Sequence, residues 1–114
     1  MKPTLLLLSV FPHRLMERLH EHFECYVHSQ LDEKQALSLA PSVRGIVATG
    51  ESTVTREQIT QLPALEIISV LGVGYEGIDL EAADDHNVCV THTPGLSTED
   101  IADFAMALLL CAAR

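Results

Sequence analysis

The sequence predicts an α/β fold in which a parallel sheet of five strands carries helices on both faces. Short apolar runs alternate along the chain with segments of helical periodicity, and such alternation is typical of a parallel sheet covered by helices. The first run, 4–9, is continuously apolar, which suits a strand buried on both faces. Farther on, Thr55 and Gln58 have the spacing of a helix capping box, which predicts the start of a helix between two apolar runs.

The same pattern places the individual elements. The expected strands are 4–9, 25–27, 45–48, 66–70 and 88–91. The expected helices are 12–23, 32–39, 55–62 and a short helix that begins at Asp79, which has the residue type of an N-cap. A parallel sheet of five strands with these connections suggests the flavodoxin-like order 2-1-3-4-5.

The C-terminal segment differs from the alternating part of the chain. Ser97 has the residue type of an N-cap, and from Phe104 onward the expected helix is apolar on every side. Such a helix must be buried all round, and one small sheet covers only one side of it. We therefore divide the chain into a domain of residues 1–97 and a helix, 98–114, that reaches a second domain or subunit. On this reasoning we expect the chain to be a piece of a longer protein.

Composition excludes several classes of function. The chain has 114 residues, 47% of them hydrophobic, and a formal charge of −9, so its length fits one globular domain. The negative charge argues against nucleic-acid binding, which requires a basic face, and gives no reason to expect a membrane partner. The apolar run 104–113 is much shorter than a membrane span. Cys25, Cys89 and Cys111 are widely spaced and form no C-x-x-C pair, so we expect reduced, buried thiols in a cytoplasmic protein.

A glycine-rich loop, 72–77, has the form G-x-G-x-x-G and follows the expected strand 66–70. In a dinucleotide-binding fold this motif opens a long helix, and an acid follows about 20 residues later at the end of the next strand. Here the helix begins only at Asp79 and is short, and the next strand ends in Thr91-His92-Thr93 without an acid. The loop is therefore not assigned to dinucleotide binding.

The same loop has a second interpretation, as a site for an anion. Gly72 and Gly74 permit positive φ angles and leave space for a ligand, and successive N–H groups at the end of a strand form a concave anion site. On this interpretation the N–H groups of Val73 and Gly74 hold a carboxylate. The alternative is a tight turn whose glycines only relieve strain, and the residues alone leave both interpretations open.

Ligands in an open parallel sheet bind at the carboxyl ends of the strands. Strands 45–48 and 66–70 should be neighbours in the sheet, so Gly50 is expected to face the same pocket as Val73 and Gly74. Thr49, Glu51 and Ser52 would add polar groups there. The alternative is that these residues belong to a solvent-exposed loop without a ligand.

Other groups of chemically active residues give weaker indications. The sequences His-Glu-His at 20–22 and Asp-Asp-His at 84–86 contain metal-ligand types, but neither has the i, i+4 spacing of a helical zinc pair, so no metal site is predicted. His92 is expected to be a loop histidine with satisfied hydrogen bonds. No catalytic triad or Cys-His pair can be argued from spacing. A phospho-receiver would need an aspartate after strand 45–48, where this chain has Ala48-Thr49-Gly50.

Two segments of the chain resemble the D-isomer-specific 2-hydroxyacid dehydrogenases. The first is VLGVGYEGID at 70–79, and the second is VTHTPGLSTEDIAD at 90–103, which runs into the apolar helix. Together with the order of the elements, the resemblance covers the whole chain. Tyr75 and the Thr-Glu-Asp start of the helix are most similar to the branch of glyoxylate, hydroxypyruvate and 2-ketogluconate reductases. The chain departs from the usual family residues at Glu76, where aspartate is common, and at Gly77.

The resemblance implies a two-domain parent enzyme that uses NADH or NADPH to reduce small 2-keto acids to D-2-hydroxy acids, as a cytoplasmic homodimer. This chain would be the N-terminal part of the substrate domain. The N–H groups of Val73 and Gly74 would hold the substrate carboxylate, Gly50 would line the pocket, and Ile101 would lie near the nicotinamide. The cofactor fingerprint and the catalytic arginine, glutamate and histidine would all lie beyond Arg114, so we expect the chain alone to be inactive.

A different class of function is compatible with the same residues. The chain could be a stand-alone flavodoxin-like module that binds a ligand or another protein. Its apolar helix, 98–113, would then be an exposed or self-associating surface.

Overall fold

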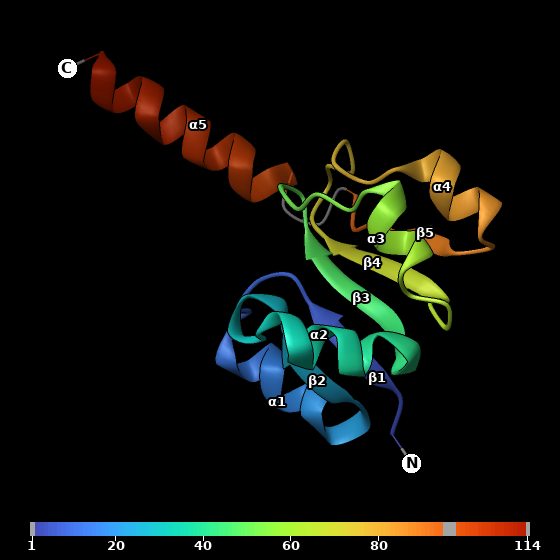
Figure 1. Cartoon of the computed structure of the whole chain (residues 1–114). Coiled ribbons are helices and arrows are strands. Elements are labelled where there is room, and N and C mark those ends of the chain that lie inside the picture. Colours follow the sequence, from blue (N-terminus) through green and yellow to red (C-terminus); the bar gives the residue numbers. More distant parts are fainter. Residues whose placement is uncertain (1, 95–97, 114) are drawn as a thin grey trace.

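The sheet has the predicted strand order. A computed structural model describes residues 2–94 and 98–113. It contains a five-stranded sheet in the order β2-β1-β3-β4-β5, and every neighbouring pair is parallel (Figure 1). The strands are β1 (Thr4–Leu7), β2 (Glu24–Val27), β3 (Val43–Thr49), β4 (Ile67–Leu71) and β5 (Cys89–Thr91). The α/β class and the flavodoxin-like order are therefore confirmed.

Helices occupy the connections between the strands as the periodicity predicts. They are α1 (His13–His22), α2 (Glu33–Leu39), α3 (Arg56–Thr60), α4 (Leu80–Asp85) and α5 (Thr98–Ala112), with short 3₁₀ turns η1 (His28–Gln30) and η2 (Ala40–Ser42). The predicted boundaries differ from these mainly at two strands. The first strand, predicted as 4–9, ends at Leu7, although the N–H of Leu8 still donates to the Val47 carbonyl at 2.9 Å. The third strand begins at Val43, two residues earlier than predicted.

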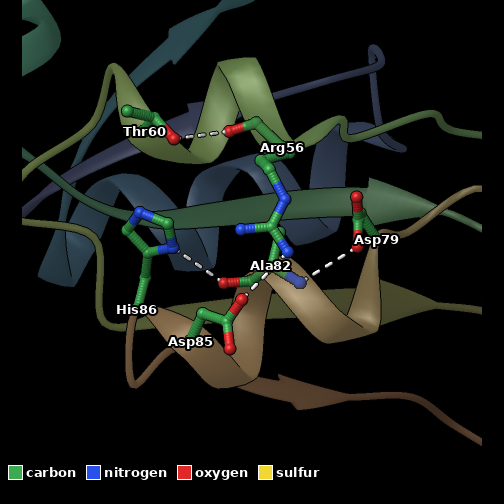
Figure 2. A network of polar contacts seen from close by, with 6 residues as sticks. All are labelled: Arg56, Thr60, Asp79, Ala82, Asp85 and His86. Carbon is green, nitrogen blue, oxygen red and sulfur yellow. Dashed lines mark hydrogen bonds and ion pairs between the residues drawn. The ribbon is translucent and has the colours of Figure 1, made fainter.

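Side-chain caps fix the starts of the helices that flank β3 and β4. The side chain of Thr55 accepts from the N–H of Gln58, whose side chain accepts in return from the N–H of Thr55, so the predicted capping box is confirmed. Asp79 caps α4 by accepting from the N–H of Ala82 at 3.0 Å, also as predicted (Figure 2).

In the same view Arg56 on α3 pairs with Asp85 on α4 at 2.9 Å. This exposed ion pair joins the two helices at the surface, where solvent screening makes the contribution of such pairs to stability small.

The core lies mainly on the sheet face that carries α2, α3 and α4. Alternate residues of the central strands point to this face, where they pack against Ile59 of α3 and Ala82 and Ala83 of α4. The buried members of this cluster are Val43, Ile46, Ala48, Val54, Ile59, Leu65, Ile68, Val70, Ile78, Ala82, Ala83 and Val88. Their full burial on one face makes the relative positions of β3, β4 and the loops after them rigid.

The opposite face is covered by α1 near β1 and β2. Leu5, Leu7, Phe11 and Val27 form a second buried cluster there, against which residues of α1 pack. On β4 and β5 the residues that point to this face are exposed or half-exposed: Ile67, Ser69, Leu71, Cys89 and Thr91. Helices therefore cover both faces, but the cover of the second face ends before β4.

Helix α5 points away from the sheet (Figure 1). Its large apolar side chains are exposed along the helix. The first of them, Phe104, has an exposed fraction of 66%, and the last, Leu110, has one of 65%. This exposure fits the prediction that the helix needs a covering surface other than this sheet. The predicted N-cap, Ser97, lies outside the described residues. No helix in the described segments is long and apolar enough to cross a membrane.

The expectation of three buried thiols is wrong. Cys25 is half-buried, and burial raises the pKa of its thiol, but Cys89 and Cys111 are exposed. The reason is positional, because Cys89 points to the uncovered face of the edge strand β5 and Cys111 lies on the projecting helix α5.

Two loops at the carboxyl edge of the sheet are joined through a close backbone contact. Val54 and Ile78 form a parallel bridge, in which the N–H of Val54 donates to the Gly77 carbonyl at 2.9 Å and the N–H of Asp79 donates to the Val54 carbonyl at 3.0 Å. A Cβ atom on Gly77 would overlap the carbonyl oxygen of Ser52. Glycine is therefore required at 77 by space, which connects the glycine loop firmly to the loop after β3.

We expect Gly77→Ala to lower the free energy of unfolding by about 1–3 kcal/mol, because backbone atoms must move to admit the methyl group. Gly50→Ala is the matched control, since a Cβ there would meet its neighbours only at ordinary distances of 3.6–3.9 Å. Its effect should stay within about 0.5 kcal/mol. Urea unfolding of the two variants measures the difference, and equal stabilities would contradict the assigned contact.

Candidate functional site

The glycine loop begins where β4 ends, at the carboxyl edge of the sheet. Gly72 has a φ of +149°, a conformation that residues with a side chain rarely adopt. A Cβ atom there would also lie 3.3 Å from the backbone nitrogen of Gly50. Gly72 therefore lets the chain turn sharply out of β4 while it stays in contact with the loop after β3.

Thr93, two residues beyond β5, holds both polar groups of Gly72. The Gly72 carbonyl accepts from the Thr93 N–H at 2.8 Å and from its hydroxyl at 3.1 Å, while the Gly72 N–H donates to the same hydroxyl oxygen at 2.9 Å. The bonds are half-buried, so solvent competes with them weakly. They connect the segment after β5 to the first residue of the glycine loop.

His92 holds the next residue of the loop. Its Nδ1 lies 2.9 Å from the Val73 carbonyl oxygen, which is an acceptor, so Nδ1 carries the proton in this contact. The His92 ring also meets the ring of Tyr75 edge to face, with centroids 5.0 Å apart. His92 thus has its hydrogen bond satisfied, as predicted, but its partner is the backbone of the glycine loop.

The N–H groups of Val73 and Gly74 are the first of a run without an acceptor in the described part of the chain. The N–H of Gly72 is bonded to Thr93 and that of Ile78 to the Tyr75 carbonyl, whereas residues 73–77 donate to no other described residue. Val73 is 52% exposed and Gly74 is half-buried, so this part of the loop lies at the surface. Two successive free N–H groups at the end of a strand can hold one anion.

Gly50 lies against these donors, as its position in the sheet predicts. An ideal Cβ on Gly50 would lie 3.7 Å from the nitrogen and 3.6 Å from the oxygen of Gly74. Thr49 and Ser52, which were expected to add polar groups to the same pocket, bond to each other. The Ser52 hydroxyl accepts from the Thr49 N–H at 2.9 Å and shares a 3.0 Å hydrogen bond with the Thr49 hydroxyl, so both close the turn after β3.

The glycine loop itself carries a carboxylate near Gly74. Glu76 is exposed, and its Oε2 would be only 2.7 Å from a Cβ on Gly74. The negative charge of Glu76 therefore sits close to the two free N–H groups. A bound anion would experience repulsion from it.

Other residues singled out from the sequence are not brought to this edge. The side chain of Ile101 lies outside what the structure describes, so its expected place near a nicotinamide stays a prediction. His86 bonds through Nδ1 to the Ala82 carbonyl at 2.8 Å, at the end of α4 (Figure 2). In the described segments, no three His, Cys, Asp or Glu side chains are grouped as a metal would require.

The contacts of His92 and Thr93 with the loop were not predicted from the sequence. The signal was present in the predicted strand order, because adjacent parallel strands end at the same edge of the sheet. Residues that follow β5 must therefore lie beside residues that follow β4. Their side-chain types, one ring N–H donor and one hydroxyl, are those that backbone carbonyls at such a junction can use.

The family of this chain follows from its similarity to known protein families. The sequence pattern described as "D-isomer specific 2-hydroxyacid dehydrogenase, catalytic domain" matches residues 5–107. The chain belongs to the D-isomer-specific 2-hydroxyacid dehydrogenase family. Among its curated relatives in this family is glyoxylate/hydroxypyruvate reductase B of Salmonella typhi, which is 35% identical over 118 residues. All of the present chain takes part in that match, but it spans only 36% of the relative.

Solved structures of this dehydrogenase family have the same fold. The 2-hydroxyacid dehydrogenase of Ketogulonicigenium vulgare Y25 superimposes with a TM-score of 0.89 and 36% identity, over 96% of this chain and 35% of its own. An NADPH-dependent glyoxylate/hydroxypyruvate reductase from Sinorhizobium meliloti, solved with citrate, gives 0.81 and 33% over 96% of this chain and 34% of its own. The resemblance inferred from the two sequence segments is thus confirmed.

Proposed function

We propose that this chain forms the carboxylate-binding part of the substrate site in an NAD(P)-dependent enzyme that reduces small 2-keto acids to D-2-hydroxy acids. The observation that carries the proposal is that the N–H groups of Val73 and Gly74, at the carboxyl end of β4 and beside Gly50, donate to no acceptor within residues 2–94 and 98–113. A carboxylate can accept from both at once, and hydrogen bonds to a charged acceptor are the stronger kind. Gly50 leaves the space in which the carboxylate would lie.

The similar proteins favour a substrate of the glyoxylate or hydroxypyruvate type. Glyoxylate/hydroxypyruvate reductases occur among both the curated relatives and the solved structures. The Sinorhizobium meliloti reductase was also solved with NADP and malonate, a small dicarboxylate.

Reduction itself requires groups that we place outside this chain. We propose that residues 1–97 are the N-terminal part of the substrate domain and that the helix 98–114 crosses to a cofactor domain of the same polypeptide, with Ile101 near the nicotinamide of NADH or NADPH. The cofactor would supply the hydride. The exposed apolar side chains of α5 support this division, because a neighbouring domain would bury them. We further propose a cytoplasmic homodimer, with neither nucleic acid nor membrane as a partner.

Exposure of α5 also favours one competing function, a module whose helix associates with another protein or a second copy of itself. The two functions differ in their ligands. A binding module has no reason to prefer a 2-keto acid, whereas the dehydrogenase site must recognise its carboxylate.

A titration followed by NMR tests the proposed site. Oxalate, an unreactive small dicarboxylate, should shift the amide signals of Val73 and Gly74 with a dissociation constant on the order of 1–10 mM. Hydroxyacetone, which has a ketone but no carboxylate, should shift neither. Gly50→Ala should weaken oxalate binding about two- to fivefold, because its methyl group would lie against the Gly74 nitrogen. Equal responses to both compounds, or shifts confined to other residues, would exclude the site.

The charge of Glu76 should oppose binding. We expect Glu76→Gln to tighten oxalate binding about two- to fivefold at low salt, and the gain should shrink as salt screens the charge. Glu21→Gln changes the net charge equally from an exposed position on α1 and serves as the control. If both substitutions have the same effect, the local placement of Glu76 is irrelevant to the site.

The 114-residue chain alone should show no turnover, because we place the hydride donor's site and the proton donor in the rest of the enzyme. Purified chain would be mixed with glyoxylate, hydroxypyruvate or pyruvate and with NADH or NADPH, and absorbance at the nicotinamide band would be followed. Reduction above the rate of buffer would show that this division of labour is wrong.

A further inference from the structure

We propose that His92 and Thr93 are positioning residues of the carboxylate site, which hold two successive peptide groups of the glycine loop so that the N–H groups of Val73 and Gly74 face the anion. The inference rests on the proposed function. It assigns a role to side chains that follow β5 and that do not themselves contact the ligand.

The first step concerns the peptide group between Gly72 and Val73. A trans peptide is planar, so its C=O and N–H point in opposite directions, and no cis peptide occurs in the described residues. The carbonyl of this group receives two hydrogen bonds from Thr93, at 2.8 Å from the N–H and 3.1 Å from the hydroxyl. The N–H of Val73 must therefore point away from Thr93, to the side where it finds no described acceptor.

The second step repeats this logic one peptide farther along. The carbonyl of Val73 accepts from Nδ1 of His92 at 2.9 Å, and the N–H of the same peptide group belongs to Gly74. That N–H must point away from His92. The edge-to-face contact with Tyr75 limits rotation of the imidazole and so keeps Nδ1 on the carbonyl.

These two contacts matter because the loop has little rigidity of its own. Gly72 and Gly74 flank the two peptide groups, and glycine permits backbone rotations that other residues resist. Rotation of either peptide would turn its N–H away from the anion. A hydrogen bond accepted by a carbonyl also polarises its peptide group, which makes the N–H on the other end a better donor.

A purely structural role would have different consequences. His92 is exposed, so its removal leaves no buried polar group unpaired and should barely change stability. Its effect should instead appear in anion binding. Thr93 is half-buried and contributes to the junction between β4 and β5, so its test needs a substitution that keeps the shape of the side chain.

Two pairs of variants separate positioning from stability. His92→Ala removes the donor, whereas His92→Asn keeps a nitrogen donor attached at the same position, Cγ. Thr93→Val removes the hydroxyl but keeps the branched shape, whereas Thr93→Ser keeps the hydroxyl. For each variant of the 114-residue chain, we would measure oxalate affinity by NMR titration and the melting temperature.

His92→Ala and Thr93→Val should bind oxalate about three- to tenfold more weakly, because each loses one hydrogen bond to the loop. His92→Asn and Thr93→Ser should bind oxalate within about twofold of the unmodified chain. In the full-length enzyme the same two weakened variants should raise KM for a 2-keto acid more than they lower kcat.

The outcomes are distinguishable. If the unmodified chain binds oxalate at Val73 and Gly74 but His92→Ala binds it equally well while folded, the positioning role of His92 is overturned and the proposed function stands. Equal losses of oxalate affinity in His92→Ala and His92→Asn would also overturn the positioning role of His92. If the unmodified chain shows no response to oxalate at these residues, the proposed function itself is wrong, and the positioning role is lost with it.

Discussion

The hydrogen bonds between Thr93 and Gly72 are the interaction on which the candidate site depends. They join the chain where it leaves β5 to the chain where it leaves β4, and they exist because adjacent parallel strands end at one edge of the sheet. Gly72 can take part only because its positive φ turns the backbone toward Thr93. The same turn presents the next two N–H groups outward. The sheet topology thus produces the loop for which we propose anion binding, and the proposed donors are backbone N–H groups.

Packing below the loop supplies the rigidity that such a site requires. Ile68 and Val70 of β4 are fully buried against the helices α3 and α4, and the loop's far end is held by the bridge between Val54 and Ile78. The loop is therefore fixed at both ends, and at its start Thr93 and His92 bond to its first two residues. A site made of backbone donors needs this support because its precision depends on the orientation of peptide groups.

Much of this arrangement could be predicted from the sequence, because it depends on local signals. Apolar runs and helical spacing gave the strand order, and the caps at Thr55 and Asp79 depend on residues only three positions apart. The proximity of Gly50 to Gly74 was predicted from the order of the strands. The orientation of single N–H groups could not be predicted, since the strand order places residues 92 and 93 beside the loop but does not say which carbonyl each side chain bonds, as His92 does that of Val73. Cys89 was placed wrongly because periodicity does not reveal which part of a sheet face lacks a covering helix.

The most direct test of the account is the hydrogen exchange of individual amides in the free chain and in the chain saturated with oxalate. We expect the N–H groups of Val73 and Gly74 to exchange quickly in the free chain, whereas that of Gly72 should already be protected by Thr93. Oxalate should slow exchange at Val73 and Gly74 alone among the three. Protection of Val73 and Gly74 before any anion is added would show that these donors are already bonded within the chain, and would contradict the account.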